Sequence, residues 1–216
     1  MTDHIITTGS ITTNTGADLK GDPNAFAYVA QGVTFGVYGQ GAAIAHAIVG
    51  DGVRQQVTVA GDVFSLNGAA EVLEGGLAGS TVTVTETGSI TSQFRINSLN
   101  ATDLAAIHLN TGGAVHNAGE ISGRIDLQAY GPVLVVNAGT LTGLYGEAIR
   151  LMPNADGAGE YLISEDFRLT NTGTIIGGMV DVNNDGNLRQ IAIREMTQHI
   201  NGTNSYAPRS SHRTAA

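Results

Sequence analysis

One segment of the chain has its oxygen-bearing residues in the order of a calcium loop. Three side chains and one backbone carbonyl would be the ligands: Asp181, Asn183, Asp185 and, through its carbonyl, Asn187. Gly186 allows the sharp turn that directs these oxygens at one cation. The carboxylate usual at the twelfth position is missing, because Ala192 stands there. An Asn/Asp-rich turn explains the same residues, so Ca²⁺ binding and a plain turn are both open.

A second group of residues has the chemistry of a polysaccharide-cleaving site. Two carboxylates and two arginines lie in neighbouring repeats and could converge: Asp126, Glu147, Arg124 and Arg150. Paired carboxylates, or a basic arginine, suit acid–base cleavage of a sugar chain. Solvated charges on a strand surface are nevertheless the ordinary case, so we predict no catalytic residues and keep the enzyme as an alternative.

The remaining residue types exclude several functions. The chain has no cysteine, which removes disulfides, thiolate metal sites and cysteine nucleophiles. None of the six histidines lies four residues from another, as a helical metal-binding pair would require. The net charge is −9 and Lys20 is the single lysine. Nucleic acid is therefore not expected as a partner, because phosphate binding needs a clustered basic face.

The two carboxylates and two arginines lie on or between the copies of a short repeat, and the candidate calcium loop follows the last copy. Each copy has an aliphatic residue, a glycine four residues later, and a second aliphatic residue two positions further. The glycines are Gly9, Gly61, Gly88, Gly119, Gly139 and Gly173. In the first copy the aliphatic residues are Ile5 and Ile11. The first two glycines are about twice as far apart as the next two, so we predict a degenerate copy within Ala27–Gly41 and about seven copies in all.

Such a repeat predicts a solenoid in which each copy is one rung stacked on the next. The anchor glycine is expected at a corner between two short strands, where glycine allows a positive φ or close approach of the neighbouring rung. An asparagine recurs two residues before the glycine in the last three copies: Asn117, Asn137 and Asn171. Such asparagines can hydrogen-bond their own backbone and their copies above and below.

The predicted fold class is therefore all-β, a parallel β-helix or β-solenoid over residues 1–180. Residues 181–216 are predicted to hold the Asp/Asn loop, a capping segment and a tail. Leu188–Ile200 places apolar residues on one helical face, although its alternation also allows a strand. Ala69–Leu77 is the best candidate for a short helix within the repeats. Segments that read A-I-x-L between copies, at 106–109 and 148–151, are expected to form another wall.

Composition agrees with a thin core of stacked aliphatic residues. Aromatic residues make up 5% of the chain, tryptophan is absent, and the thirty glycines are about twice the usual number. The N-terminal residues have no basic region and no apolar core, so no Sec signal peptide is recognised. No apolar run approaches the roughly 20 residues of a membrane span.

The pattern V-x-N-x-G-x-I-x-G, with A-I-x-L between copies, covers about Ile5–Gly178. It resembles the β-strand repeats of large bacterial exoproteins, namely hemolysin- and adhesin-like secreted proteins and autotransporter passengers. The resemblance implies a β-solenoid, an extracellular or cell-surface location, and a role in adhesion or matrix building. The chain lacks the tandem G-G-x-G-x-D repeats of calcium-dependent toxins, so calcium-driven folding of the whole rod is not implied.

The repeat begins almost at the first residue, which leaves few residues for a cap at that end. An uncapped stack of strands can accept another copy, and a head-to-tail contact that does not close produces a filament. We therefore expect a structural, non-enzymatic protein that binds itself, with the C-terminal tail able to add a strand to the neighbour. The alternatives are a monomeric adhesin that binds extracellular glycans through loops at Asn97–Asp103 and Met152–Tyr161, and the polysaccharide-cleaving enzyme.

Overall fold

The computed structural model describes residues 3–12, 16–19, 21–38, 45–66, 71–73, 79–93, 105–110, 112–128, 132–152, 154–155, 161–162, 167–182 and 188–191. Every regular element within these residues is a β-strand, and none is a helix. The two large sheets are parallel, apart from one antiparallel pair near their C-terminal end. For this part of the chain, the prediction of an all-β fold with parallel strands is confirmed.

Three rows of strands run along the molecule. The first row is a seven-stranded sheet: β1 (Asp3–Ile6), β4 (Phe26–Val29), β7 (Gln56–Val59), β10 (Ser80–Val84), β13 (Gly113–Asn117), β16 (Val133–Asn137) and β20 (Phe167–Asn171). The second row starts with β2 (Ser10–Thr12), β5 (Thr34–Val37), β8 (Asp62–Ser65), β11 (Ser89–Ser92) and β14 (Glu120–Ser122). The third row starts with β3 (Ala17–Asp18), β6 (Ile48–Gly50), β9 (Glu71–Leu73), β12 (Ala105–Leu109) and β15 (Arg124–Gln128).

Two long strands complete the second and third rows together. They are β17 (Thr140–Met152) and β21 (Thr174–Val182). The beginning of β17 pairs with β14 and its end pairs with β15, while β21 pairs along both parts of β17. The second and third rows are therefore joined into one sheet at the C-terminal end of the molecule.

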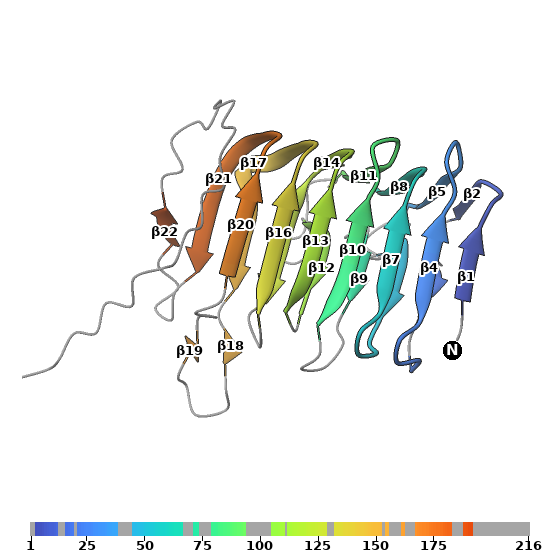
Figure 1. Ribbon diagram of the computed structural model, residues 1–216, viewed down its shortest axis with the longest axis horizontal. Coiled ribbons are helices and arrows are strands. Elements are labelled where there is room, and N and C mark those ends of the chain that lie inside the picture. The colour runs from blue at the N-terminus through green and yellow to red at the C-terminus, as the bar shows by residue number, and fades with distance from the viewer. Residues whose placement is uncertain are drawn as a thin grey trace, which may run out of the picture.

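Neighbouring strands in each row come from successive repeats. Thus β1 pairs with β4, and β4 pairs with β7, always in parallel. Figure 1 shows the first row standing side by side in chain order from β1 to β20. Strand β5 and all but the first residue of β4 fall in the stretch Ala27–Gly41, where a degenerate repeat was predicted. Each repeat therefore makes its strand pairs with the repeat before it and the repeat after it.

The core lies between the rows and consists of stacked aliphatic side chains. In the first row Val57, Val82, Val115 and Val135 occupy one register position in four successive strands. All four are buried, and so are the inward residues of the other rows, such as Ile90, Ile121 and Ile149. Burying one such side chain contributes about 1.5–3 kcal/mol. Repetition of small contributions, rather than one large aromatic cluster, stabilises the fold.

The anchor glycines stand where a first-row strand turns into a second-row strand. A Cβ atom at Gly119, Gly139 or Gly173 would overlap the carbonyl oxygen of the anchor glycine in the preceding repeat. Gly61 and Gly88 meet carbonyl oxygens of the preceding repeat in the same way. None of these five has a positive φ. The corners therefore need glycine because neighbouring repeats approach closely, and not because the backbone is left-handed.

The first repeat is shifted by one residue from the expected alignment. Ser10, and not Ile11, lies in register with Phe35, and Ile5 lies in register with the outward-facing Tyr28. Because successive side chains of a strand point to opposite faces, this shift turns both isoleucines outward. Ile5 is 64% exposed and Ile11 is 56% exposed. Gly9 is likewise displaced, and a Cβ there would lie 3.2 Å from the Thr34 carbonyl oxygen and 3.8 Å from the Thr34 nitrogen.

Two segments for which a helix was considered contain strands, and for Leu188–Ile200 a strand was the stated alternative. Within Ala69–Leu77, residues Glu71–Leu73 form β9, which pairs with β6 and β12. Within Leu188–Ile200, residues Leu188–Ile191 form β22, an antiparallel partner of β21, and the rest of that segment lies outside the described residues. A short apolar run fits either period, and pairing with an adjacent strand decides in favour of β-structure.

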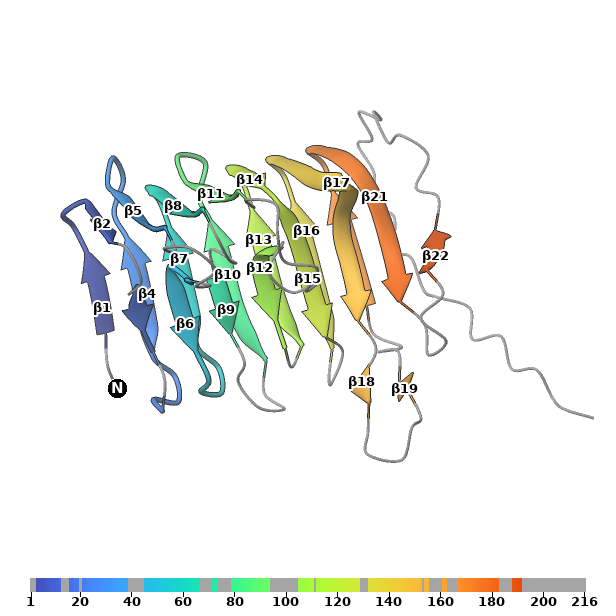
Figure 2. The ribbon, with the colours of Figure 1, turned by 180° about the vertical axis from the view of Figure 1, so that it is seen from behind.

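The predicted loop Met152–Tyr161 contains part of an antiparallel pair. The pair consists of β18 (Asn154–Ala155) and β19 (Tyr161–Leu162), and both views place it below the strands of the rows, in the C-terminal part of the molecule (Figures 1 and 2). The other predicted binding loop, Asn97–Asp103, lies outside the described residues.

The close approach at the corners predicts a stability difference between two glycines. Gly139→Ala should lower the free energy of unfolding by about 1–3 kcal/mol, because the added Cβ must displace the backbone of the preceding repeat. Gly9→Ala, the matched control in the shifted repeat, should change it by less than about 0.5 kcal/mol. Urea denaturation followed by circular dichroism measures both values. Equal losses in the two variants would contradict the close-approach explanation.

Candidate functional site

The four charged residues proposed as a sugar-cleaving group do come together, between strands β15 and β17. The guanidinium of Arg124 donates to both carboxylate oxygens of Asp126, with Nη2 at 2.8 Å from Oδ2. Its Nη1 also donates to Oε2 of Glu147 at 2.8 Å. Arg150 donates from Nη2 to the same Glu147 oxygen at 2.6 Å. The four side chains form one continuous chain of ion pairs.

Burial sets the chemistry of this charged group. Asp126 has no exposed surface, and Arg124 is 2% exposed. Burial raises the pKa of Asp126, and the hydrogen bond and charge of Arg124 oppose that shift. Burial acts to lower the pKa of Arg124, but Asp126 and Glu147 outweigh it, so the pKa of Arg124 is raised and the guanidinium stays charged. The Asp126 carboxylate thus has an arginine partner and no surface that a sugar could reach.

The charged group connects successive repeats in the third row. Asp126 lies between His108 and Arg150 in the register of β12, β15 and β17. These three residues occupy the face opposite the inward Ile107, Ile125 and Ile149, yet His108 and Asp126 are also buried. Asp126 and Arg150, which carry opposite charges, therefore stand at one register position in successive repeats. Removing one partner of a buried ion pair lowers the free energy of unfolding strongly, because the other charge is left buried without a partner. The charged group therefore helps to hold the register of the repeats around it.

A ladder of three asparagines lies at the inner edge of the first row, as the sequence predicted. The amide nitrogen of Asn117 donates to the side-chain oxygen of Asn137 at 2.7 Å, and Asn137 donates to Asn171 at 2.7 Å. Each amide also reaches a nearby backbone group, such as the carbonyl of Gly173 from Asn171 at 3.2 Å. All three side chains are buried. The ladder satisfies the polar atoms at the turns of three successive repeats.

The candidate calcium loop lies mostly outside the described residues. Asp181 belongs to β21, where its backbone pairs with Leu151 and Arg189. Asn183, Asp185 and Asn187 fall in the part of the chain that is not described. Among the described residues, no group of three acidic or histidine side chains is arranged to hold a metal ion. Calcium binding at 181–187 remains a prediction from the sequence.

The two ends of the rows have strand edges without a described partner. At the N-terminal end these are the outer edges of β1, β2 and β3. At the C-terminal end they are the outer edge of β20 and the beginning of β21, whereas β22 pairs with the later part of β21. Three of the four exposed large apolar side chains among the described residues lie at these ends: Ile5, Ile11 and Ile176. Among the described residues, both ends thus combine a strand edge that no described strand covers with exposed apolar surface.

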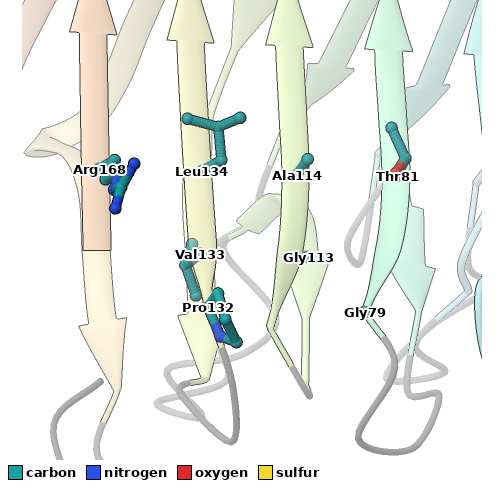
Figure 3. A pocket seen from close by; sticks show the side chains of 8 residues that line it. All are labelled: Gly79, Thr81, Gly113, Ala114, Pro132, Val133, Leu134 and Arg168. Atoms are coloured by element: carbon teal, nitrogen blue, oxygen red, sulfur yellow. The ribbon is translucent and has the colours of Figure 1, made fainter. Parts of the chain in front are cut away.

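A shallow groove crosses the outer face of the first row. Its volume is about 550 Å³, and Figure 3 shows it across β10, β13, β16 and β20. The lining residues are mostly small or apolar: Gly79, Thr81, Gly113, Ala114, Pro132, Val133, Leu134 and Arg168. Arg168 is the single charged residue of the lining, which has no aromatic ring on which a sugar could stack. No sequence pattern predicts this groove, because its residues become neighbours only when the strands pair.

Comparison of the chain with protein-family models, curated proteins and solved structures finds no match. Among the described residues, no helix is long and apolar enough to cross a membrane.

The asparagine ladder predicts a non-additive set of substitutions. Earlier repeats have Val59 and Val84 at this register position, so valine fits there sterically. Asn137→Val alone should cost about 1–3 kcal/mol of unfolding free energy, because Asn117 and Asn171 each lose a buried partner. The triple variant Asn117→Val, Asn137→Val, Asn171→Val should be more stable than the single variant, since no broken ladder remains. Urea denaturation that shows additive losses would contradict this role of the ladder.

Proposed function

We propose that the protein is a non-enzymatic β-solenoid that assembles head to tail into a filament or surface matrix. The observation that carries this proposal is that β1 and β20, at opposite ends of one parallel row, each have an edge that no other described strand pairs. The two strands run in the same direction, so the edge of one copy can continue the sheet of another. After each head-to-tail contact, the growing assembly still has one free β1 edge and one free β20 edge. Further copies can therefore add, and the result is an open filament.

The proposal that the rows form a solenoid rests on their regular order. Each of the first five repeats places one short strand in each row, and the last two place a long strand across two rows. The corner glycines of the last five repeats allow each of these repeats to lie directly on the one before it. A closed winding of about seven rungs, with the core inside, accounts for both features.

An extracellular or cell-surface location in bacteria is part of the same proposal. It is supported by the resemblance of the V-x-N-x-G-x-I-x-G repeats to those of secreted exoproteins. The acidic composition, with a net charge of −9, would also suit strengthening of such a matrix by Ca²⁺ at 181–187.

Binding of an extracellular glycan by a monomer is the second candidate. The groove on the first row favours it, because Arg168 could pair with the carboxylate of an acidic sugar. The groove is open and lacks stacking aromatic rings, so we rank this candidate below assembly. The buried Asp126 and its pairing with Arg124 give less support to a polysaccharide-cleaving site.

Electron microscopy and light scattering over a concentration series, with and without a calcium chelator, test the assembly. We expect the purified chain to form filaments above a threshold concentration. Ile5→Lys should raise that threshold by roughly tenfold, because a lysine on an edge strand opposes pairing with another chain. Gln56→Lys is the control, since it adds the same charge to an exposed position in the middle of the first row. Monodisperse monomers under every condition would overturn the proposal.

A further inference from the structure

The register of the strands allows each end of the molecule to be compared with the other. In the first row, Asp3 begins a line of paired outward positions that passes through Phe26, Gln56, Thr81, Ala114 and Leu134 and ends at Arg168. Asp3 and Arg168 are both exposed. An acidic residue and a basic residue therefore stand at the two ends of one line.

A line in the second row behaves in the same way. It starts at Ile11, passes through Gly36, Phe64, Thr91, Ser122 and Thr142, and ends at Ile176. Ile11 and Ile176 are each 56% exposed, on a face where the positions between them are otherwise mostly small or hydroxyl-bearing. The two isoleucines thus match each other across the ends of this line.

We infer, on the basis of the assembly proposed above, that successive copies join in the same register that the repeats use within one chain. Arg168 of one copy then lies beside Asp3 of the next, and Ile176 lies beside Ile11. Paired strands are about 4.8 Å apart, so side chains on one line are direct neighbours. Opposite charges and apolar residues at such positions favour pairing.

The pairing of Arg168 with Asp3 and of Ile176 with Ile11 favours one register of the two copies over others. A slip of one residue would turn Asp3 toward the inner face while Arg168 stays outside, because side chains alternate between faces. It would also separate the two isoleucines. In the third row, β3 of the next copy would fall beside Met179–Val182, the position that β22 already occupies, so joining in this register requires β3 of the next copy to displace β22. The matched side chains lie in the first two rows.

The charge pair contributes little energy at an exposed position, but reversing one charge replaces attraction with repulsion. Arg168→Glu alone places two carboxylates together at every junction, and Asp3→Lys alone places two cations together. Each single variant should raise the threshold concentration for filaments about threefold to tenfold. Glu120→Lys, which reverses a charge in the middle of the second row, should leave the threshold close to that of the unchanged protein.

An equimolar mixture of the two single variants gives the sharpest test. In an alternating filament, the glutamate introduced at position 168 meets the lysine introduced at position 3, and Arg168 of the other copy meets Asp3. The mixture should therefore assemble at nearly the threshold of the unchanged protein, by light scattering and electron microscopy. If the unchanged protein forms filaments but the single variants assemble equally well, or the mixture is no better than either variant, this register is wrong while assembly stands. If the unchanged protein forms no filaments, the proposed function itself fails.

Discussion

The structure depends on parallel pairing of each repeat with the next at the spacing of adjacent strands. The corners show how closely the repeats approach, because the backbone nitrogen of Thr140 donates to the carbonyl of Gly119 at 2.8 Å. Thr174 donates to Gly139 in the same way, at 2.8 Å. Side chains at these glycines would force the repeats apart. The thin aliphatic core and the stacked polar groups both require this spacing.

Polar groups buried inside such a stack must find partners in the neighbouring repeats. In the first row, the asparagines of the ladder are partners for one another. In the third row, the ion pairs around Arg124 and Asp126 have the same role. Both networks run along the stack, from one repeat to the next. A buried network is stabilising only when its members are satisfied. We therefore interpret these residues as parts that hold the register of the repeats, and the ends as the surfaces available for interaction.

Much of the fold could be predicted from the sequence, because the spacing of the repeated residues shows which positions occupy equivalent places in successive repeats. The recurring glycine, the asparagine before it and the A-I-x-L segments predicted parallel strands, corners and the ladder. The shift in the first repeat could not be predicted, since Ile5 and Ile11 match the spacing of the other copies whichever face they occupy. The helix expected at Ala69–Leu77 failed because a short apolar segment fits two periods, and only its neighbours β6 and β12 decide.

The candidate sites, too, could be predicted from the sequence only in part. The sequence predicted that Arg124, Asp126, Glu147 and Arg150 could converge, but it could not show that Asp126 would be fully buried. It also gave no sign that Asp3 and Arg168 share a line, because that relation passes through five other strands. Positions that are distant in sequence become equivalent only when the register is known.

X-ray fibre diffraction from aligned filaments tests the central claim most directly, because it measures spacing along the axis of assembly. Strands that continue from copy to copy should give a strong axial reflection near 4.8 Å. They should also give a longer axial repeat of roughly 34 Å, which is one copy of seven first-row strands. Filaments with another axial repeat, or without the 4.8 Å reflection along the axis, would contradict continuous head-to-tail stacking.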